Sequence, residues 1–187
     1  MKKIVLAVAC GITALSLSAQ NLLKNPDFEE IIPAKLSNAI KKYLDAEEIP
    51  KGWSFNPPGN PSKFTIMTDA ETSQKGSCYL RVEQKDPKLA SSCTQWWLPV
   101  QGGKKHKLSV FAKGKGTILL QVIAYTGKKQ IIKSFASGKM QPVGADWKEY
   151  SFTAELPADA KLANVHFKMN GVVDLDNAAY VVVEGDL

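Results

Sequence analysis

Beyond residue 60 the chain alternates apolar and polar positions in short segments that turn residues separate. The segments are rich in β-branched and aromatic residues, which is typical of strands. The pattern predicts strands over residues 64–68, 78–84, 94–100, 107–113, 117–125, 130–135, 147–154, 163–169 and 178–184. Strands at this spacing predict an all-β fold, an antiparallel β-sandwich or jelly roll, and no linker divides it.

The alternation also predicts which side chains face the core. In segment 163–169, Val165 and Phe167 share one face, whereas Asn164, His166 and Lys168 share the other. Where a strand has one apolar and one mixed face, we expect the mixed face to meet solvent or a ligand.

Residues 34–46 show a different period. Leu36, Ile40, Tyr43 and Leu44 recur at the spacing of one helix face, with lysines opposite. We expect a short helical insertion that caps the sandwich, in preference to a partner-binding helix.

The N-terminus resembles a secretory signal peptide. Lys2 and Lys3 precede an apolar run that ends near Ala19, too short to span a membrane. We therefore expect a signal peptide over 1–19, one domain over 20–187, and a secreted protein, periplasmic or extracellular. We favour a Cys10 that is removed with the signal over a lipoprotein anchor, because no Leu precedes it by three residues.

The charge argues against nucleic acid as a partner. Removing residues 1–19 removes two lysines and no acid, so the formal charge falls from +6 to +4. Arg81 is the single arginine, and the lysines are scattered among strands and turns. Proteins that grip phosphate usually use arginine forks as well. A weak attraction to acidic polysaccharide is compatible with this charge.

Two cysteines remain after the signal, Cys78 and Cys93. An even pair in an exported protein suggests a disulfide. A hairpin centred on the turn signal at 85–87 would place the two residues opposite each other, near disulfide range. We predict a structural disulfide between them.

Three stretches resemble carbohydrate-binding modules of families 4 and 9. They are Asn21 to Glu29 with Gly52-Trp53, Gln95 to Gly114, and Trp147 to Thr153 with Leu175 to Ala178. The resemblance implies a galactose-binding-like jelly roll in which Trp53 packs under the sheet. It also implies a structural calcium ion (Ca²⁺) at Glu29 and Asp176, near the chain ends. Two features depart from the family. The chain has an insertion after Glu29, and His106 stands where the family usually has a Tyr.

Sugar binding in such sandwiches needs flat aromatic faces and polar groups for the hydroxyls. A regular strand would point Trp96 and Trp97 to opposite faces, and Trp96 shares the side of Leu98 and Val100. We therefore expect Trp96 in the core and Trp97 as the stacking residue. The other candidate ligand-binding residues are Gln95, Phe111, Gln121, Tyr125 and His166.

No motif pairs two carboxylates for glycoside hydrolysis, and no other catalytic signature is present in the sequence. The expected function is a secreted, non-catalytic module that recognises a poly- or oligosaccharide. Two alternatives stay open: a protein-binding or adhesive sandwich at the cell surface, and an accessory subunit of a glycoside hydrolase system.

Overall fold

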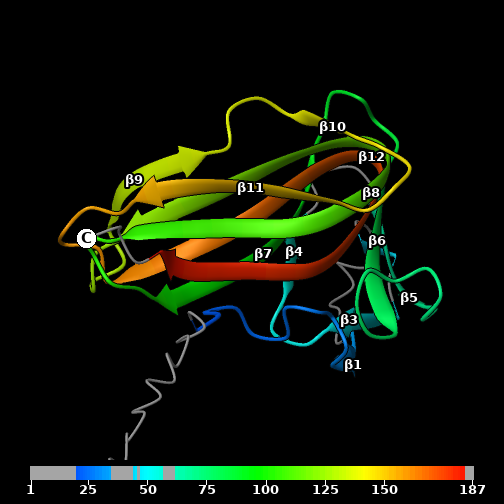
Figure 1. Ribbon diagram of the computed structural model, residues 1–187, viewed down its shortest axis with the longest axis horizontal. Coiled ribbons are helices and arrows are strands. Elements are labelled where there is room, and N and C mark those ends of the chain that lie inside the picture. Colours follow the sequence, from blue (N-terminus) through cyan, green and yellow to red (C-terminus); the bar gives the residue numbers. More distant parts are fainter. Residues whose placement is uncertain (1–19, 35–43, 46, 57–61, 184–187) are drawn as a thin grey trace, which may run out of the picture.

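A computed structural model describes residues 20–34, 44–45, 47–56 and 62–183 of the chain, and all its regular elements there are strands. The strands are β1 (Ile31–Pro33), β2 (Leu44–Asp45), β3 (Glu48–Pro50), β4 (Ser54–Asn56), β5 (Ser62–Thr68), β6 (Cys78–Gln84), β7 (Ser91–Pro99), β8 (Lys105–Tyr125), β9 (Ile131–Ala136), β10 (Gln141–Val143), β11 (Lys148–Glu155) and β12 (Leu162–Val183). Figure 1 shows β8 and β12 running the length of the molecule.

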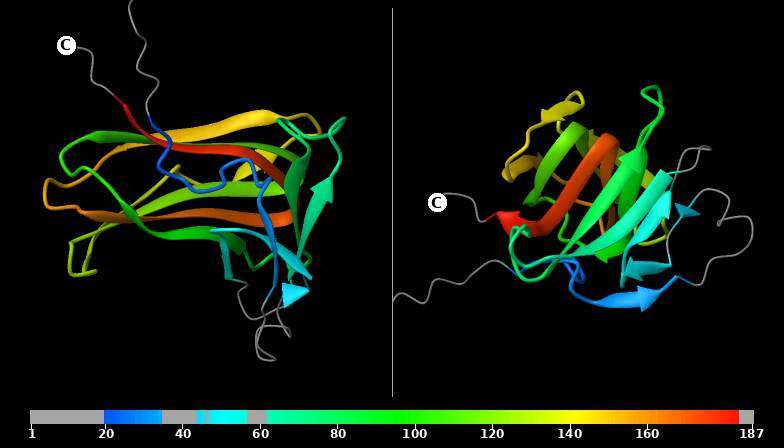
Figure 2. Two further views of the ribbon diagram at one scale, coloured as in Figure 1. Left: turned by 90° about the horizontal axis from the view of Figure 1, so that it is seen from below. Right: turned by 90° about the vertical axis from the view of Figure 1, so that its right-hand side faces the viewer.

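The long strands β8 and β12 pair with each other along nearly their whole length and pass through both layers of a sandwich (Figure 2). In the first layer, sheet I, their segments 105–113 and 171–183 lie between β11 and β6, and β5 follows β6. In the second layer, sheet II, the two long strands contribute their segments 114–125 and 162–170. On one side of them lie β9 and β10, and on the other side lies β7, followed by β4. The predicted antiparallel β-sandwich is thus confirmed.

Glycines allow the long strands to bend from one layer into the other. Gly171 has a φ of 81°, and a Cβ atom there would lie 2.5 Å from the carbonyl oxygen of Lys115. Gly114 has a φ of 135°, and a Cβ atom on it would collide with the carbonyl oxygen of Val172. Only glycine fits such close backbone approach without strain.

The core lies between the two sheets and takes the apolar side of each alternating strand. Leu80 and Val82 of sheet I and Phe167 and Leu120 of sheet II are buried there. Trp53 is buried as well, with its ring 5.1 Å from that of Phe28 and 5.7 Å from that of Phe167, as the resemblance implied.

Two expectations about local structure are corrected. Most of the predicted helix over 34–46 lies outside the described residues, and its end, Leu44–Asp45, is a strand parallel to β5. The hairpin between β6 and β7 is wrong: β6 pairs with β5 and β12 in sheet I, whereas β7 pairs with β12 and β4 in sheet II.

The predicted disulfide falls with that hairpin. Cys78 pairs in register with Thr68, and Cys93 with Phe55 and Phe167. Both cysteines are free and buried in the structure. The turn at 85–87 carries the chain between layers instead of folding it back on itself, so nothing brings the two thiols opposite each other.

Candidate functional site

The outer surface of sheet II carries two neighbouring tryptophans. The register between β7 and β12 shifts between Ala163 and Val165, so that Trp96 and Trp97 together oppose Asn164. Such a β-bulge breaks the alternation of a strand. Trp97 adopts a left-handed φ of 58°, and its main-chain amide donates to Asn164 Oδ1 at 2.8 Å.

The bulge leaves both indoles exposed. Trp96 is 43% exposed and Trp97 37%, and their ring centroids are 6.3 Å apart. The prediction that Trp96 lies in the core is therefore wrong. It assumed a regular two-residue period, which the extra residue in β7 interrupts.

Polar and aromatic side chains of β12 and β8 adjoin the two indoles. The His166 ring lies 5.5 Å from the Trp96 ring and the Tyr125 ring 5.0 Å from the Trp97 ring, both edge to face. Buried Asn164 donates from Nδ2 to the Tyr125 hydroxyl at 2.9 Å. We call Trp96, Trp97, Tyr125, Asn164 and His166 the tryptophan platform.

His166 is held as a neutral ring within this platform. Its Nδ1 is 3.0 Å from the Thr94 hydroxyl, while its Nε2 is buried without a hydrogen-bond partner among the described residues. Burial, with a smaller contribution from the charge of Lys168, lowers the pKa of His166 to about 4. An unpaired buried polar atom in a native site is a place where a ligand or water can complete the hydrogen bonding.

Gln121 extends the polar surface toward β9. It pairs in register with His166 and with Ala136, and its Nε2 donates to the Ser134 hydroxyl at 2.8 Å. The structure thus brings together four of the six predicted ligand-binding residues, Trp97, Gln121, Tyr125 and His166.

Gln95 and Phe111 lie elsewhere. Gln95 is 1% exposed, and its amide bonds both the main-chain N–H and the carbonyl of Lys24, so it anchors the N-terminal segment. Phe111 pairs with Glu149 and Asp176 in sheet I, in the other layer. The start of β8, which carries Phe111, lies in sheet I, and only the later part of β8 reaches sheet II.

The sequence interpretation also missed Lys129. This residue follows Tyr125 in the turn to β9, and its Nζ lies 4.5 Å from the centre of the Trp97 ring. The Gly-Lys-Lys run after Tyr125 indicated a turn but not the direction of either lysine.

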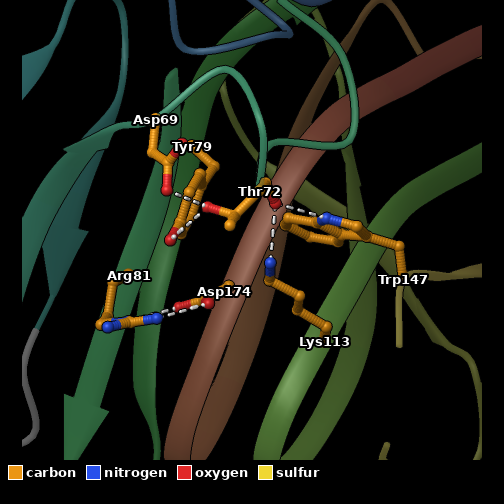
Figure 3. A network of polar contacts seen from close by, with 7 residues as sticks. All are labelled: Asp69, Thr72, Tyr79, Arg81, Lys113, Trp147 and Asp174. Carbon is orange, nitrogen blue, oxygen red and sulfur yellow. Dashed lines mark hydrogen bonds and ion pairs between the residues drawn. The ribbon is translucent and has the colours of Figure 1, made fainter. Parts of the chain in front are cut away.

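A separate polar network lies on sheet I (Figure 3). The carbonyl of Thr72 accepts hydrogen bonds from Lys113 Nζ at 2.7 Å and from Trp147 Nε1 at 2.9 Å. The ammonium of Lys113 also lies 5.1 Å from the ring centre of Tyr79 and 4.6 Å from that of Trp147. These contacts fasten the loop before β6 onto the sheet, so these side chains serve the fold.

Below this network Arg81 and Asp174 form a two-pronged ion pair, with N–O distances of 2.7 and 2.8 Å. Asp174 is 2% exposed. The carboxylate of Asp174 raises the pKa of Arg81, chiefly because it accepts hydrogen bonds from the guanidinium and also because of its negative charge. The single arginine of the chain is therefore engaged within sheet I.

The two expected calcium ligands hold the loop between β5 and β6. Glu29 accepts from the Ser77 amide, the Ser77 hydroxyl and the Cys78 amide at 2.6–2.8 Å. Asp176 accepts from the amides of Gln74, Lys75 and Asn177 at 2.6–2.9 Å.

The chemistry around these carboxylates fits a hard cation in part. Asp176 is fully buried, and burial raises the pKa of its carboxyl. The hydrogen bonds from the three amides lower this pKa, and the charge of Glu29 raises it by a smaller amount. The buried Gln74 Oε1 accepts no hydrogen bond from any described residue. Calcium would neutralise charge here and tie the N-terminal segment to β12. Among the described residues no three His, Cys, Asp or Glu side chains gather as a metal site, so calcium stays a prediction.

The chain was compared with known proteins. No protein-family model matches it, and no curated protein matches it significantly. The enzymatically active domain of tailspike protein 4 from bacteriophage CBA120 is similar over 71% of this chain, with 19% identity and a TM-score of 0.61. This chain spans only 20% of that protein.

Two carbohydrate-binding modules match over their full length. The CBM22-1 xylan-binding domain of Paenibacillus barcinonensis Xyn10C aligns with 90% of this chain and 98% of its own, at 13% identity and a TM-score of 0.56. TmCBM61, solved with β-1,4-galactotriose, aligns with 88% of this chain and 100% of its own, at 11% identity and a TM-score of 0.58. These likenesses establish the jelly-roll fold of carbohydrate-binding modules. No helix of the described residues is long and apolar enough to cross a membrane.

Proposed function

We propose that this protein is a non-catalytic carbohydrate-binding module that binds a glycan at the tryptophan platform. The observation that carries the proposal is the bulge at Trp97, which turns two adjacent indoles to one face instead of burying one of them. Pyranose rings stack their C–H faces on such surfaces. A fold that hosts xylan- and galactan-type binding in other proteins supports the same conclusion.

The polar neighbours of the indoles suit sugar hydroxyls. His166 offers a ring nitrogen without a protein partner, and Gln121 keeps its carbonyl oxygen for a further hydrogen bond in the same row of the sheet. A protein-binding sandwich would present a broader aliphatic surface without such groups. We therefore favour sugar over a protein partner.

A binding role is favoured over hydrolysis by what the platform is made of. Glycoside hydrolysis generally uses two carboxylates that flank the bond. The strand segments of sheet II contain no Asp or Glu in the sequence; they are 54–56, 91–99, 114–125, 131–136, 141–143 and 162–170. The strands of sheet II therefore supply the platform with aromatic and neutral polar side chains, which suit recognition of a sugar, and with no carboxylate for hydrolysis.

The N-terminal pattern supports export, so we place this module outside the cytoplasm, where it would meet polysaccharide. N-terminal sequencing of the protein from a producing cell tests this. A chain that begins near residue 20 supports cleavage after Ala19, and an intact Met1 contradicts it.

A glycan array tests the binding proposal, with Trp96→Ala and Trp97→Ala beside the unaltered protein. Ile32→Ala is the control, because Ile32 is 39% exposed on β1, outside sheet II. We expect selective binding that falls roughly tenfold or more in each tryptophan variant, as for central aromatic contacts, and is unchanged in the control. Binding to no glycan, or binding that neither tryptophan affects, would contradict the proposal.

A further inference from the structure

The two layers of the sandwich differ in charge. Sheet I carries acids in β6, β11 and the end of β12, among them Glu83, Glu149 and Asp174. The strand segments of sheet II contain Lys115, Lys133 and Lys168 and no acid. Sheet I carries bases as well, such as Lys107 and Lys113, so the layers differ in that the strands of sheet II contain bases without acids.

The turn after β8 carries one cation directly to the platform. Lys129 adopts a left-handed φ of 62°, and its amide donates to the Thr126 carbonyl at 3.0 Å. The Thr126 amide donates in turn to the Gln130 carbonyl at 2.9 Å. This closed turn holds the ammonium of Lys129 4.5 Å from the centre of the Trp97 ring.

Lys168 brings a second positive charge to the same surface. Phe167 and Met169 on either side of it are fully buried in the core, so alternation places Lys168 on the outer face with His166. Its charge lowers the pKa of His166, behind the larger effect of burial. The platform therefore lies in a positive field.

We propose that the glycan bound at the tryptophan platform is anionic, with carboxylate or sulfate groups on its sugar rings. This inference rests on the proposed function and names its ligand class. A pyranose ring stacked on the exposed Trp96 indole carries its substituents at the ring edge, where they can pair with Lys168 and with Lys129, whose ammonium lies over the neighbouring Trp97 ring. The strands of sheet II place no carboxylate there to repel an acidic chain.

Single-stranded nucleic acid combines negative charge and flat rings as well, but the observations favour a glycan. The only arginine is paired with Asp174 in sheet I, away from the platform. Phosphate recognition usually draws on arginine forks. Lys129 and Lys168 are single point charges beside the platform, which suits a sparsely charged polymer.

Titration calorimetry of the purified protein tests the proposal with four probes: polygalacturonate, neutral β-1,4-galactan, dextran sulfate and oligo-dT. We expect an anionic glycan to bind about tenfold more tightly than galactan in 20 mM NaCl, and the advantage to shrink severalfold in 300 mM NaCl because salt screens exposed charges. Whether polygalacturonate or dextran sulfate binds better distinguishes carboxylate from sulfate.

Lysine variants identify the charges responsible. Lys129→Gln and Lys168→Gln should each weaken binding of the anionic glycan about threefold, in line with exposed ion pairs, and should weaken galactan binding less. Lys63→Gln removes the same charge from exposed β5 of sheet I and should change neither.

The outcomes separate the two proposals. If galactan binds as tightly as both anionic glycans at both salt concentrations, and Trp97→Ala weakens that binding, the inference of an anionic ligand is overturned. The proposed binding function would then remain intact. Binding of none of the three glycans would count against the binding function itself. Tighter binding of oligo-dT than of any glycan, or full affinity for the anionic glycan in both lysine variants, would overturn the inference.

Discussion

The main-chain amide of Trp97 donates a hydrogen bond to the side-chain oxygen of Asn164 across the bulge between β7 and β12. Asn164 is fully buried, and its amide nitrogen bonds the Tyr125 hydroxyl at the same time. The Asn164 side chain thus supplies a hydrogen bond to the Trp97 amide where the bulge interrupts the pairing of the two strands. It also holds the Tyr125 ring, which contacts the Trp97 ring.

We therefore expect Asn164→Ala to lower the free energy of unfolding by about 1–3 kcal/mol, because it leaves a buried N–H group without an acceptor. Urea unfolding followed by tryptophan fluorescence measures this. Tyr125→Phe is the comparison variant, since it keeps the bond to Trp97 and removes only the acceptor of Asn164 Nδ2, so we expect it to cost less than Asn164→Ala, which removes both bonds. Equal losses in the two variants would mean that the bond to Trp97 does not hold the bulge.

Much of the fold could be predicted from the sequence because its strands alternate regularly. The limits appear where a strand continues through glycine. Segments 107–113 and 117–125 were expected to be two strands with a turn at Gly114, but they form the single bent strand β8. Local pattern cannot distinguish a turn from a bend, since what decides is the close approach of Gly171 on the neighbouring strand.

The site residues could be predicted where β8 and β12 pair with each other without a register shift, which holds from Leu162 to Asp176. Gln121, Tyr125 and His166 lie on the expected face because their strands keep a period of two. Trp96 was misplaced because one extra residue shifts the parity of everything before it. Whether Trp96 or another residue forms the bulge depends on Asn164, 67 positions away from Trp97, which no local pattern reveals.

The ion pair of Arg81 and Asp174 should matter more for stability than exposed ion pairs, because Asp174 is almost fully buried. Arg81→Ala leaves this carboxylate without its partner, so we expect a loss of about 3 kcal/mol in the free energy of unfolding. The double variant Arg81→Ala/Asp174→Asn should recover part of that loss, because the buried charge is gone. Chemical denaturation of the unaltered protein, Arg81→Ala, Asp174→Asn and the double variant measures the coupling, and additive losses would argue against it.

Calcium, if it binds at Glu29 and Asp176, should stabilise the folded chain by mass action. At a hundredfold excess over the dissociation constant we expect the melting temperature to rise by about 5–10 °C. Asp176→Asn should abolish the response. Asp69→Asn should keep it, since this carboxylate in the same loop bonds only Thr72 and Glu71. Differential scanning calorimetry with calcium and with EDTA decides, and identical melting temperatures would rule out this site.

His166 should make the protein sensitive to acid. Its pKa is lowered to about 4 in the folded chain, chiefly by burial, whereas an unfolded chain titrates near the ordinary value of 6.5. A lowered histidine pKa contributes stability that is fully present above about pH 6.5 and is lost as the pH falls toward 4, where the unfolded chain binds the extra proton. The loss from this group should be about 3 kcal/mol between pH 7 and pH 4. Urea unfolding at several pH values should therefore show a shallower acid dependence for His166→Gln than for the unaltered protein. Because the carboxylates titrate alike in both proteins, the difference isolates the ring, and parallel curves would show that the pKa of His166 is the same in the folded and unfolded chains.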